Sequence, residues 1–148
     1  MKQCKYIVLL VFLIFVSCKT YTIEPFYLKE LLLKVNPETM KSDENSKVKF
    51  GLTNVKFTYK SNKIDYIKVL DKNGVKDVIN NSPALEMRVT LKNNKKYNMY
   101  FDTVYLENDT LTGCKSRFFP SLTTKILFNE IIKIEVQDGG KNYQNVGY

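Results

Sequence analysis

The sequence predicts a mainly β domain of the α+β class, an antiparallel sheet with one amphipathic helix near its start. Apolar and polar residues alternate with a period of two in several short segments after residue 48, which is typical of strands with one buried face. Pairs of Asn, Asp and Gly separate these segments as turns. A period of 3.6 residues occurs between residues 25 and 35. The composition, 44% hydrophobic and 26% charged over 148 residues, is that of a globular chain with one core.

The first 17 residues predict a signal peptide. Lys2 and Lys5 form a basic start, and residues 6–16 form an uninterrupted apolar run of 11 residues. That run is shorter than the about 20 residues that a membrane-spanning helix needs. It has the length of the hydrophobic region of a signal peptide. The sequence therefore predicts export from the cytoplasm.

The apolar run ends at Phe15-Val16-Ser17-Cys18, which resembles the lipobox of bacterial lipoprotein precursors. Phe15 departs from the Leu that is usual at its position. The resemblance implies that the Cys18 sulfur carries a diacylglyceryl group and that the signal peptidase cuts between Ser17 and Cys18. The new α-amino group can then take a further acyl chain such as palmitate. The alternatives are a cleaved secretory peptide and an uncleaved anchor, and in both of them Cys18 is incidental.

A lipid anchor at Cys18 predicts a place in the cell envelope, because several acyl chains together hold a protein stably on a membrane. Cys18 is followed by neither an Asp nor an acidic pair. By resemblance to known sorting signals, this favours the outer membrane, facing the periplasm. Cys114 is then the lone remaining thiol, expected to be buried and inert. Intermolecular pairing and redox sensing are the alternatives for it.

The next segments are a tether, a helix and a loop. We expect residues 18–24 to be a lipidated tether. Pro25 suits the first position of a helix, and apolar residues then recur at i, i+3, i+4 and i+7 (Leu28, Leu31, Leu32 and Val35). This predicts a helix over residues 25–35, packed on the sheet or lying on the membrane surface. Residues 37–47 are almost all polar and predict a loop.

Residues 48–80 predict a first β block. Val55, Phe57 and Tyr59 alternate with polar residues, and residues 64–70 and 75–79 predict two further strands. Asn73-Gly74 between the last two is a hairpin signal, because both turn positions favour residues that accept positive φ.

Residues 85–137 predict a second β block. Strands are expected at 85–91, 97–106, around 111, and at 125–128 and 131–136. This rhythm resembles the small SH3-like and Sm-like barrels, with Asn129-Glu130 at the place of their last 3₁₀ turn. The resemblance implies a small five-stranded barrel, and the alternative is a meander sheet with the helix packed on one face. Residues 138–148 predict a polar tail.

Few residues suggest catalysis. The chain has no His, so imidazole chemistry is excluded. Asp102, Glu107 and Asp109 lie near one expected turn, where paired carboxylates could share a proton or bind a cation. Turn chemistry alone accounts for Asn108-Asp109. We expect no catalytic residue, no metal ligand and no cofactor, and the competing prediction is an enzyme centred on Asp102 and Asp109.

The candidate contact residues are lysines and aromatics. Nearly all of the +8 formal charge comes from Lys, and Lys92, Lys95 and Lys96 cluster at one expected hairpin. Such a cluster can bind an anionic membrane or polymer, or it can be a solvated edge. Export, and the presence of only two arginines, argue against nucleic acid. Phe118 and Phe119 lie in an expected loop, where apolar rings suit a contact point.

Together these observations predict a small non-catalytic lipoprotein of the cell envelope with a binding or structural role. Its expected partners are the membrane, through the N-terminal lipid, and an envelope protein or anionic envelope polymer. Besides the carboxylate enzyme, the alternative is a phage-exclusion or defence lipoprotein.

Overall fold

The computed structural model describes residues 19–35, 40–43, 46–50, 53–56, 59–62, 64–119, 121–141 and 143–145. The signal peptide and lipobox predictions lie outside the described residues. Within these ranges the protein is mainly β, with antiparallel sheets and one α-helix, as the sequence predicts.

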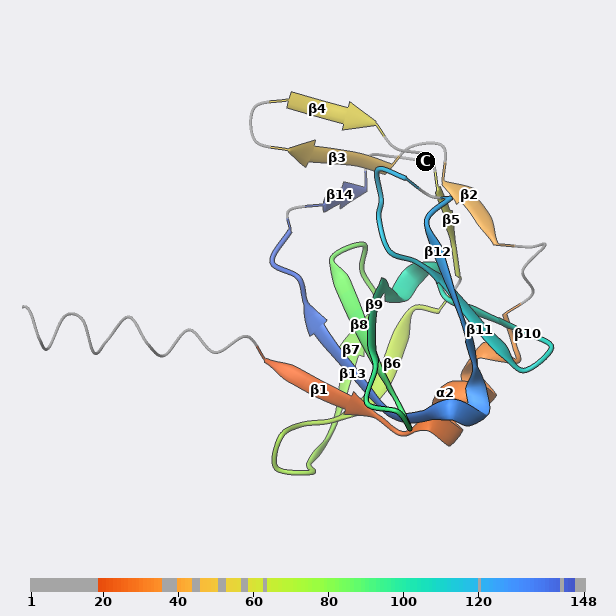
Figure 1. Ribbon diagram of the computed structural model, residues 1–148. Helices are drawn as coiled ribbons and strands as arrows, with labels where there is room; N and C mark the ends of the chain where they lie inside the picture. Colours follow the sequence, from red (N-terminus) through yellow and green to blue (C-terminus); the bar gives the residue numbers. More distant parts are fainter. Residues whose placement is uncertain are drawn as a thin grey trace, which may run out of the picture.

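The centre of the fold is a six-stranded antiparallel sheet (Figure 1). Its strands, in spatial order, are β7 (Lys76–Asn80), β6 (Tyr66–Leu70), β1 (Thr20–Ile23), β13 (Ile131–Asp138), β8 (Leu85–Leu91) and β9 (Lys96–Tyr100). The first strand of the chain is therefore an inner strand, because Thr20 lies opposite Gln137 and Thr22 opposite Leu70. The sequence places residues 20–23 in a tether, but they form β1, and Ile23 is completely buried.

Three smaller sheets complete the β structure. Their strands are β10 (Tyr105–Glu107), β11 (Thr110–Cys114) and β12 (Thr123–Leu127); β14 (Tyr143–Asn145), β3 (Ser46–Phe50) and β4 (Thr53–Lys56); and β2 (Lys41–Asp43) and β5 (Tyr59–Ser61). β2 lies in the expected loop 37–47, and β14 lies in the expected polar tail. Both pair with strands far away in the sequence, so no local apolar alternation marks them.

Helix α2 (Pro25–Leu32) begins at Pro25, as expected, and ends three residues before the expected end at residue 35. Leu28 and Leu32 are completely buried, whereas Phe26 and Leu33 are exposed. The apolar stripe therefore faces the core, and α2 packs against β13 and β10. This is the sheet-packed alternative of the two that the sequence leaves open.

The second β block has the expected strand order but does not close into a barrel. The strand expected at 97–106 is bent by a 3₁₀ turn, η3 (Phe101–Thr103), into β9 and β10. A second 3₁₀ turn, η4 (Phe128–Glu130), follows β12. Within the described residues no ladder joins β12 to β13, because β1 and β8 occupy the two edges of β13. The expected five-stranded barrel is therefore wrong; β13 lies inside the larger, open sheet.

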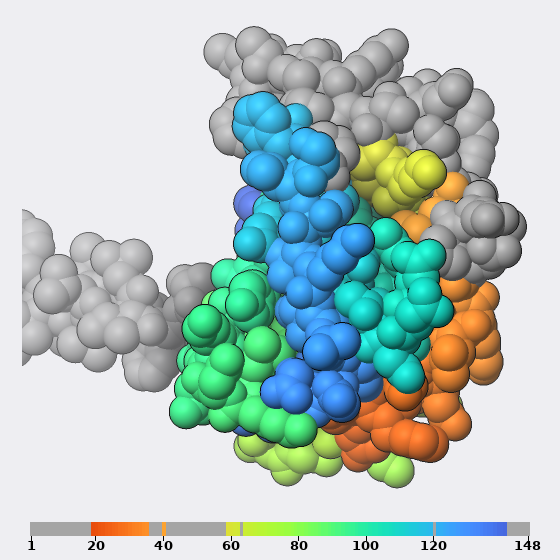
Figure 2. Space-filling model, turned by 45° about the vertical axis from the view of Figure 1, so that its right-hand side comes forward, coloured from red at the N-terminus to blue at the C-terminus, as the bar shows by residue number. Residues whose placement is uncertain are grey.

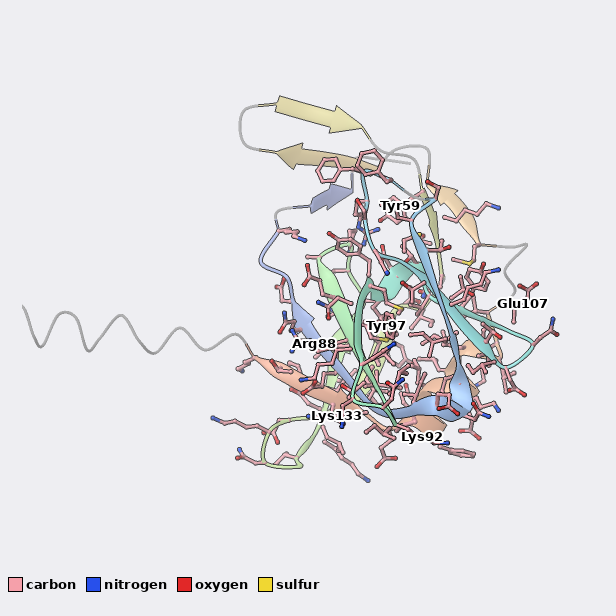
Figure 3. All side chains as sticks on the ribbon, viewed as in Figure 1. Tyr59, Arg88, Lys92, Tyr97, Glu107 and Lys133 are labelled. Atoms are coloured by element: carbon pink, nitrogen blue, oxygen red, sulfur yellow. The ribbon has the colours of Figure 1, made fainter. Side chains whose placement is uncertain are left out.

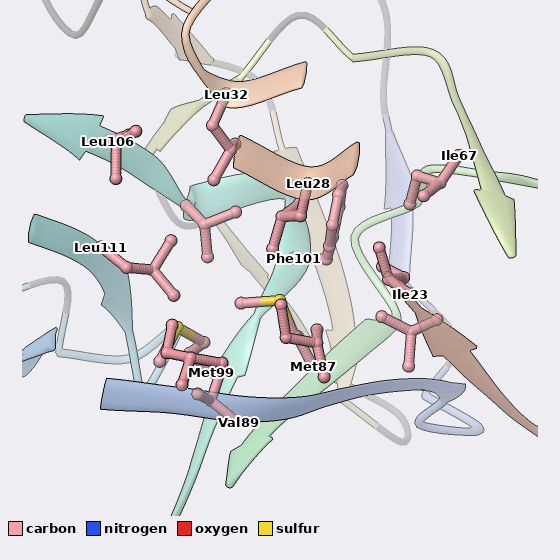
Figure 4. Close-up of a cluster of buried hydrophobic side chains, with 14 of the residues drawn as sticks. Ile23, Leu28, Leu32, Ile67, Met87, Val89, Met99, Phe101, Leu106 and Leu111 are labelled. Carbon is pink, nitrogen blue, oxygen red and sulfur yellow. The ribbon is translucent and has the colours of Figure 1, made fainter. Parts of the chain in front are cut away.

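The core lies between the six-stranded sheet, α2 and the β10–β12 sheet (Figure 4). Its buried apolar side chains come from nearly every element and include Ile23, Leu28, Leu32, Ile67, Met87, Val89, Met99, Phe101, Leu106 and Leu111. At Gly113 the β11 backbone lies directly against the side chains of Met99 and Val104. A Cβ there would lie 2.6 Å from Met99 Sδ and 2.8 Å from Val104 Cγ1, so the packing requires glycine.

Candidate functional site

The three candidate lysines, Lys92, Lys95 and Lys96, lie at the tip of the β8–β9 hairpin and are exposed. The tip follows the end of β8, whereas the start of β8 lies beside the partner of Thr20. In Figure 3 Lys92 lies at the lower side of the molecule, whereas β1 begins at its left side. The lysine tip is therefore remote from the point where the chain enters the sheet.

The structure does not bring Asp102 and Asp109 together. Asp109 is in the turn before β11, where its Oδ1 lies 2.7 Å from Lys29 Nζ of α2 and its side chain is 72% exposed. Asp102 is buried in η3. The carboxylate enzyme requires these two groups in one pocket, whereas Asp102 is buried and Asp109 is exposed beside Lys29; the enzyme stays an alternative prediction. Among the described residues there is also no group of three side chains suited to hold a metal ion.

Asp102 instead belongs to a buried cluster formed with Arg117, Tyr59 and Tyr100, which we call the Arg117 cluster. Arg117 Nη2 donates to Asp102 Oδ1 at 2.5 Å and to the carbonyl oxygen of Pro83 at 2.6 Å. The guanidinium carbon lies 4.2 Å from the ring centroids of both tyrosines, so the charged group is sandwiched between two aromatic faces. Tyr59 Oη donates to Asp102 Oδ2 at 2.9 Å.

Burial dominates the electrostatics of this cluster. It raises the pKa of the Asp102 carboxyl, and the adjacent Arg117 guanidinium opposes that shift. The Arg117 side chain is only 1% exposed, so its charge depends on protein partners in place of water. No local sequence pattern marks Arg117 as a structural residue; the one available signal is an Arg in a chain that otherwise uses Lys almost throughout.

Arg117 fixes the base of the segment that carries the aromatic candidates, residues 115–122. Phe118 is 44% exposed, Phe119 62% and Leu122 53%. The Lys115 amide donates to the Leu122 carbonyl at 2.9 Å, and this hydrogen bond closes the loop. Figure 2 shows the loop projecting at the upper end of the molecule. Apolar side chains are thus displayed on a loop whose base is held by a buried ion pair.

Cys114, the one cysteine among the described residues, is half-buried at the end of β11. Its backbone N–H donates to Thr103 Oγ1 at 3.0 Å. Burial raises the pKa of the thiol, so it carries less thiolate at neutral pH than a free cysteine.

A groove of about 440 Å³ lies where the chain turns from strand β1 into helix α2. Its lining comes from β1, β6, β7 and the start of α2: Thr22, Glu24, Tyr27, Lys68, Val69, Leu70, Lys76, Asp77 and Val78. β1 pairs with β6 only at Thr22 and Leu70, because the chain turns into α2 after Ile23. Tyr27 Oη accepts the Lys68 backbone N–H at 3.3 Å, in the place of a further strand residue. We call this feature the β1–β7 groove; no sequence pattern marks it.

These features define a small antiparallel β domain with one packed helix, a buried arginine cluster, an apolar loop and a charged groove. Comparison with protein-family models, with curated proteins and with solved structures finds no match for this chain. Among the described residues no helix has the length and apolar character to cross a membrane.

Proposed function

We propose that the protein is a lipid-anchored lipoprotein of the bacterial cell envelope, with a non-catalytic binding or structural role at the periplasmic face of the outer membrane. The sequence support is the lipobox-like segment that ends at Cys18. One observation carries the proposal further: β1 begins at Thr20, only two residues after Cys18, as an inner strand of the largest sheet.

The consequence is a domain attached directly to its anchor. An extended chain rises about 3.3 Å per residue, so at most about 7 Å separates Cys18 from Thr20. Acyl chains on Cys18, at about 0.8 kcal/mol per buried methylene, would therefore hold the sheet itself against the headgroup layer. This arrangement suits a protein that acts at the membrane surface.

The 115–122 loop supports the binding role. Exposed aromatic and aliphatic side chains on a pre-organised loop offer contact area at a low entropic cost. The Arg117 cluster supplies that order here. We propose an envelope protein as the partner of this loop and an anionic envelope polymer as the alternative.

We also propose that strands β8 to β13 follow an SH3-like strand order with an open seam. The support is the sequence of β8, a bent β9–β10 segment, β11, β12, a 3₁₀ turn and β13. The seam between β12 and β13 is where the arrangement departs from a closed barrel.

Intact mass and membrane fractionation of the expressed protein test the anchor. We expect wild-type protein to be membrane-bound, to lack residues 1–17 and to carry acyl mass, and Cys18→Ala to lose the acyl mass and the cleavage. Cys114→Ala is the matched control, since it removes a thiol outside the lipobox and should behave as wild type. Wild-type protein that keeps Met1 and carries no acyl mass would show that the proposal is wrong.

Pull-down from envelope extract tests the binding role. The acylated wild-type protein should retain a partner at moderate salt, and the Phe119→Ser variant should retain less of it. The matched control is Phe26→Ser, which removes a similarly exposed ring, 73% exposed, from helix α2 and should retain the partner as wild type does. Capture of no partner by the wild-type protein would argue against the binding role.

A further inference from the structure

We propose that the β1–β7 groove binds the zwitterionic phosphoethanolamine headgroup of a phospholipid in the membrane that holds the anchor. The membrane location rests on the proposed function above. The chemical class of the ligand rests on the groove itself.

The sheet register places most of the strand residues that line the groove on one face, and Val69 and Asp77, which lie opposite each other, on the other face. Leu70 lies opposite both Thr22 and Lys76, and Lys68 lies opposite Val78. Directly opposed residues of antiparallel strands share a face of the sheet. The other face of β6 points its side chains into the core, where Ile67 and Val69 are buried. The groove is therefore on the outer face, open to a ligand.

Two positive and two negative side chains line this groove. Lys68, Lys76, Glu24 and Asp77 are all exposed. In the described part of the chain none of the four takes part in an ion pair. Lysine ammonium groups bind a phosphate as point charges, and a carboxylate accepts hydrogen bonds from an ammonium group. Asp77 lies opposite the core-facing Val69, and its Oδ1 accepts the Val78 N–H at 2.8 Å. Glu24 is therefore the carboxylate left to meet an amine, and two lysines with one carboxylate suit a ligand that carries a phosphate and an amine better than a plain anion.

Apolar surface lies between the charges. Leu70, Val78 and the Tyr27 ring contribute it, and the volume of about 440 Å³ lies in the range of small-molecule pockets, which is about 300–1,000 Å³. Tyr66 and Val75, on the same β6–β7 hairpin, are 59% and 60% exposed. Tyrosine and small apolar residues at a membrane surface sit well at the headgroup boundary. A glycerol backbone with the start of its acyl chains suits such a lining.

The position of the groove favours a membrane lipid over a free solute. Thr22 is four residues after Cys18, so the extended chain between them spans about 13 Å at most. The headgroup layer on each side of a bilayer is about 5–8 Å deep. Figure 1 shows β1 and the β6–β7 hairpin next to the point where the chain enters the sheet. Because about 13 Å exceeds the depth of that layer, the proposal requires β1 to run along the membrane surface; in that orientation a headgroup reaches the groove while its acyl chains stay in the bilayer.

The first experiment titrates the acylated protein, in detergent micelles, with glycerophosphoethanolamine. Binding is followed by calorimetry and by the amide NMR signal of Thr22. We expect saturable binding, weakened at least about tenfold in Lys68→Gln/Lys76→Gln, which loses both phosphate contacts. The control Lys95→Gln/Lys96→Gln removes the same charge from the remote hairpin tip and should bind as wild type. Equal binding by both double variants, or no binding by wild type, overturns the proposal.

The amine half of the ligand has its own test. Glycerol phosphate carries the phosphate without the amine, and wild type should bind it about tenfold more weakly than glycerophosphoethanolamine. Glu24→Gln should reduce that difference, because the ammonium group loses its carboxylate partner. Equal affinity of wild type for the two compounds overturns the zwitterion assignment.

The lipid source is tested in vesicles. Acylation of Lys68 and Lys76 by an amine-reactive reagent, read by mass spectrometry, should slow relative to acylation of Lys95 and Lys96 in the same sample when phosphatidylethanolamine is added to phosphatidylglycerol vesicles that carry the protein. The internal ratio is needed because the lipid amine also consumes the reagent and slows every lysine alike. An unchanged rate, alongside headgroup binding in micelles, overturns the lipid as the source. If the protein proves to have no acyl chain, the proposed function fails, while the micelle titration still decides the ligand class.

Discussion

Arg117 contacts several parts of the fold that are far apart in the sequence. It joins η3 through Asp102, the segment before β8 through Pro83, and β5 and β9 through two tyrosine rings. A buried ion pair adds little net stability by itself, but removal of one partner leaves the other charge buried without compensation. The cluster is therefore sensitive to any single truncation.

For this reason Arg117→Ala should lower the free energy of unfolding by about 3–5 kcal/mol. Arg88→Ala is the matched control: Arg88 Nε donates to Asn98 Oδ1 at 3.2 Å on the sheet surface, and its loss should cost about 1 kcal/mol or less. Urea denaturation followed by circular dichroism measures both variants. A loss for Arg117→Ala no larger than that for Arg88→Ala would show that the cluster does not hold the loop base.

Cys114 should react slowly in the folded protein. Because burial raises the pKa of its thiol, less thiolate is present at pH 8 than in a free cysteine. We expect alkylation by iodoacetamide to be at least about tenfold slower in the native state than in urea, with Cys114 assigned by peptide mapping. A native rate equal to the denatured rate, or disulfide-linked dimers, would favour the intermolecular or redox alternative.

At the scale of elements, the sequence predicts best where a local pattern decides the structure. β8 occupies the expected residues 85–91, since its alternation is strict. A hairpin turn forms at the expected place, but only Gly74 of the Asn73-Gly74 pair has a positive φ, 78°. The Gly74 N–H donates to the Asp71 carbonyl oxygen at 3.0 Å, and Asp71 Oδ1 accepts the amides of Asn73 and Val75, so the loop is longer than the two-residue turn that the sequence predicts. The 3₁₀ turn expected near Asn129-Glu130 is present as η4.

The elements that the sequence does not predict depend on distant partners. β1 has only four residues, and its pairing with β13 spans more than a hundred positions. The Arg117 cluster has the same origin, because Tyr59 and Asp102 are 43 positions apart. The β1–β7 groove arises where a strand ends and a helix begins. No short window of sequence contains either feature.

Helix α2 offers an internal test with two adjacent leucines. Leu32 is completely buried and its neighbour Leu33 is 67% exposed, so the same substitution removes a buried side chain in one variant and an exposed side chain in the other. Leu32→Ala should cost about 2–5 kcal/mol of unfolding free energy through lost burial and a cavity. Leu33→Ala should change it by about 0.5 kcal/mol or less. Equal effects in urea denaturation would contradict the packing of α2 on the sheet and revive a helix that lies on the membrane.

At the scale of the whole molecule, the entry of the chain into the sheet couples folding to anchoring. The first described residues after the proposed lipid site form an inner strand between β6 and β13, so a lipid on Cys18 would restrict how the domain turns relative to the membrane. The β1–β7 groove lies near that anchor, and the Lys92 hairpin tip lies at the far end of β8. The groove and the hairpin tip therefore lie at different places relative to the proposed anchor.

A flexible insertion separates the folding of β1 from the orientation of the domain on the membrane. About eight Gly and Ser residues placed after Lys19 would add a reach of about 15 Å while β1 stays intact. We expect an unchanged urea midpoint, because no buried contact is altered. In vesicles, however, trypsin should cleave the β6–β7 hairpin at Lys72 and Lys76 faster than in the protein without the insertion, since the hairpin can leave the headgroup layer. Cleavage at Lys92 and Lys95 serves as the control, because that tip points away from the anchor in both forms. If the hairpin is cut at the same rate with and without the insertion, the short link does not set the orientation of the domain, and the membrane contact of the groove has to come from some other part of the chain.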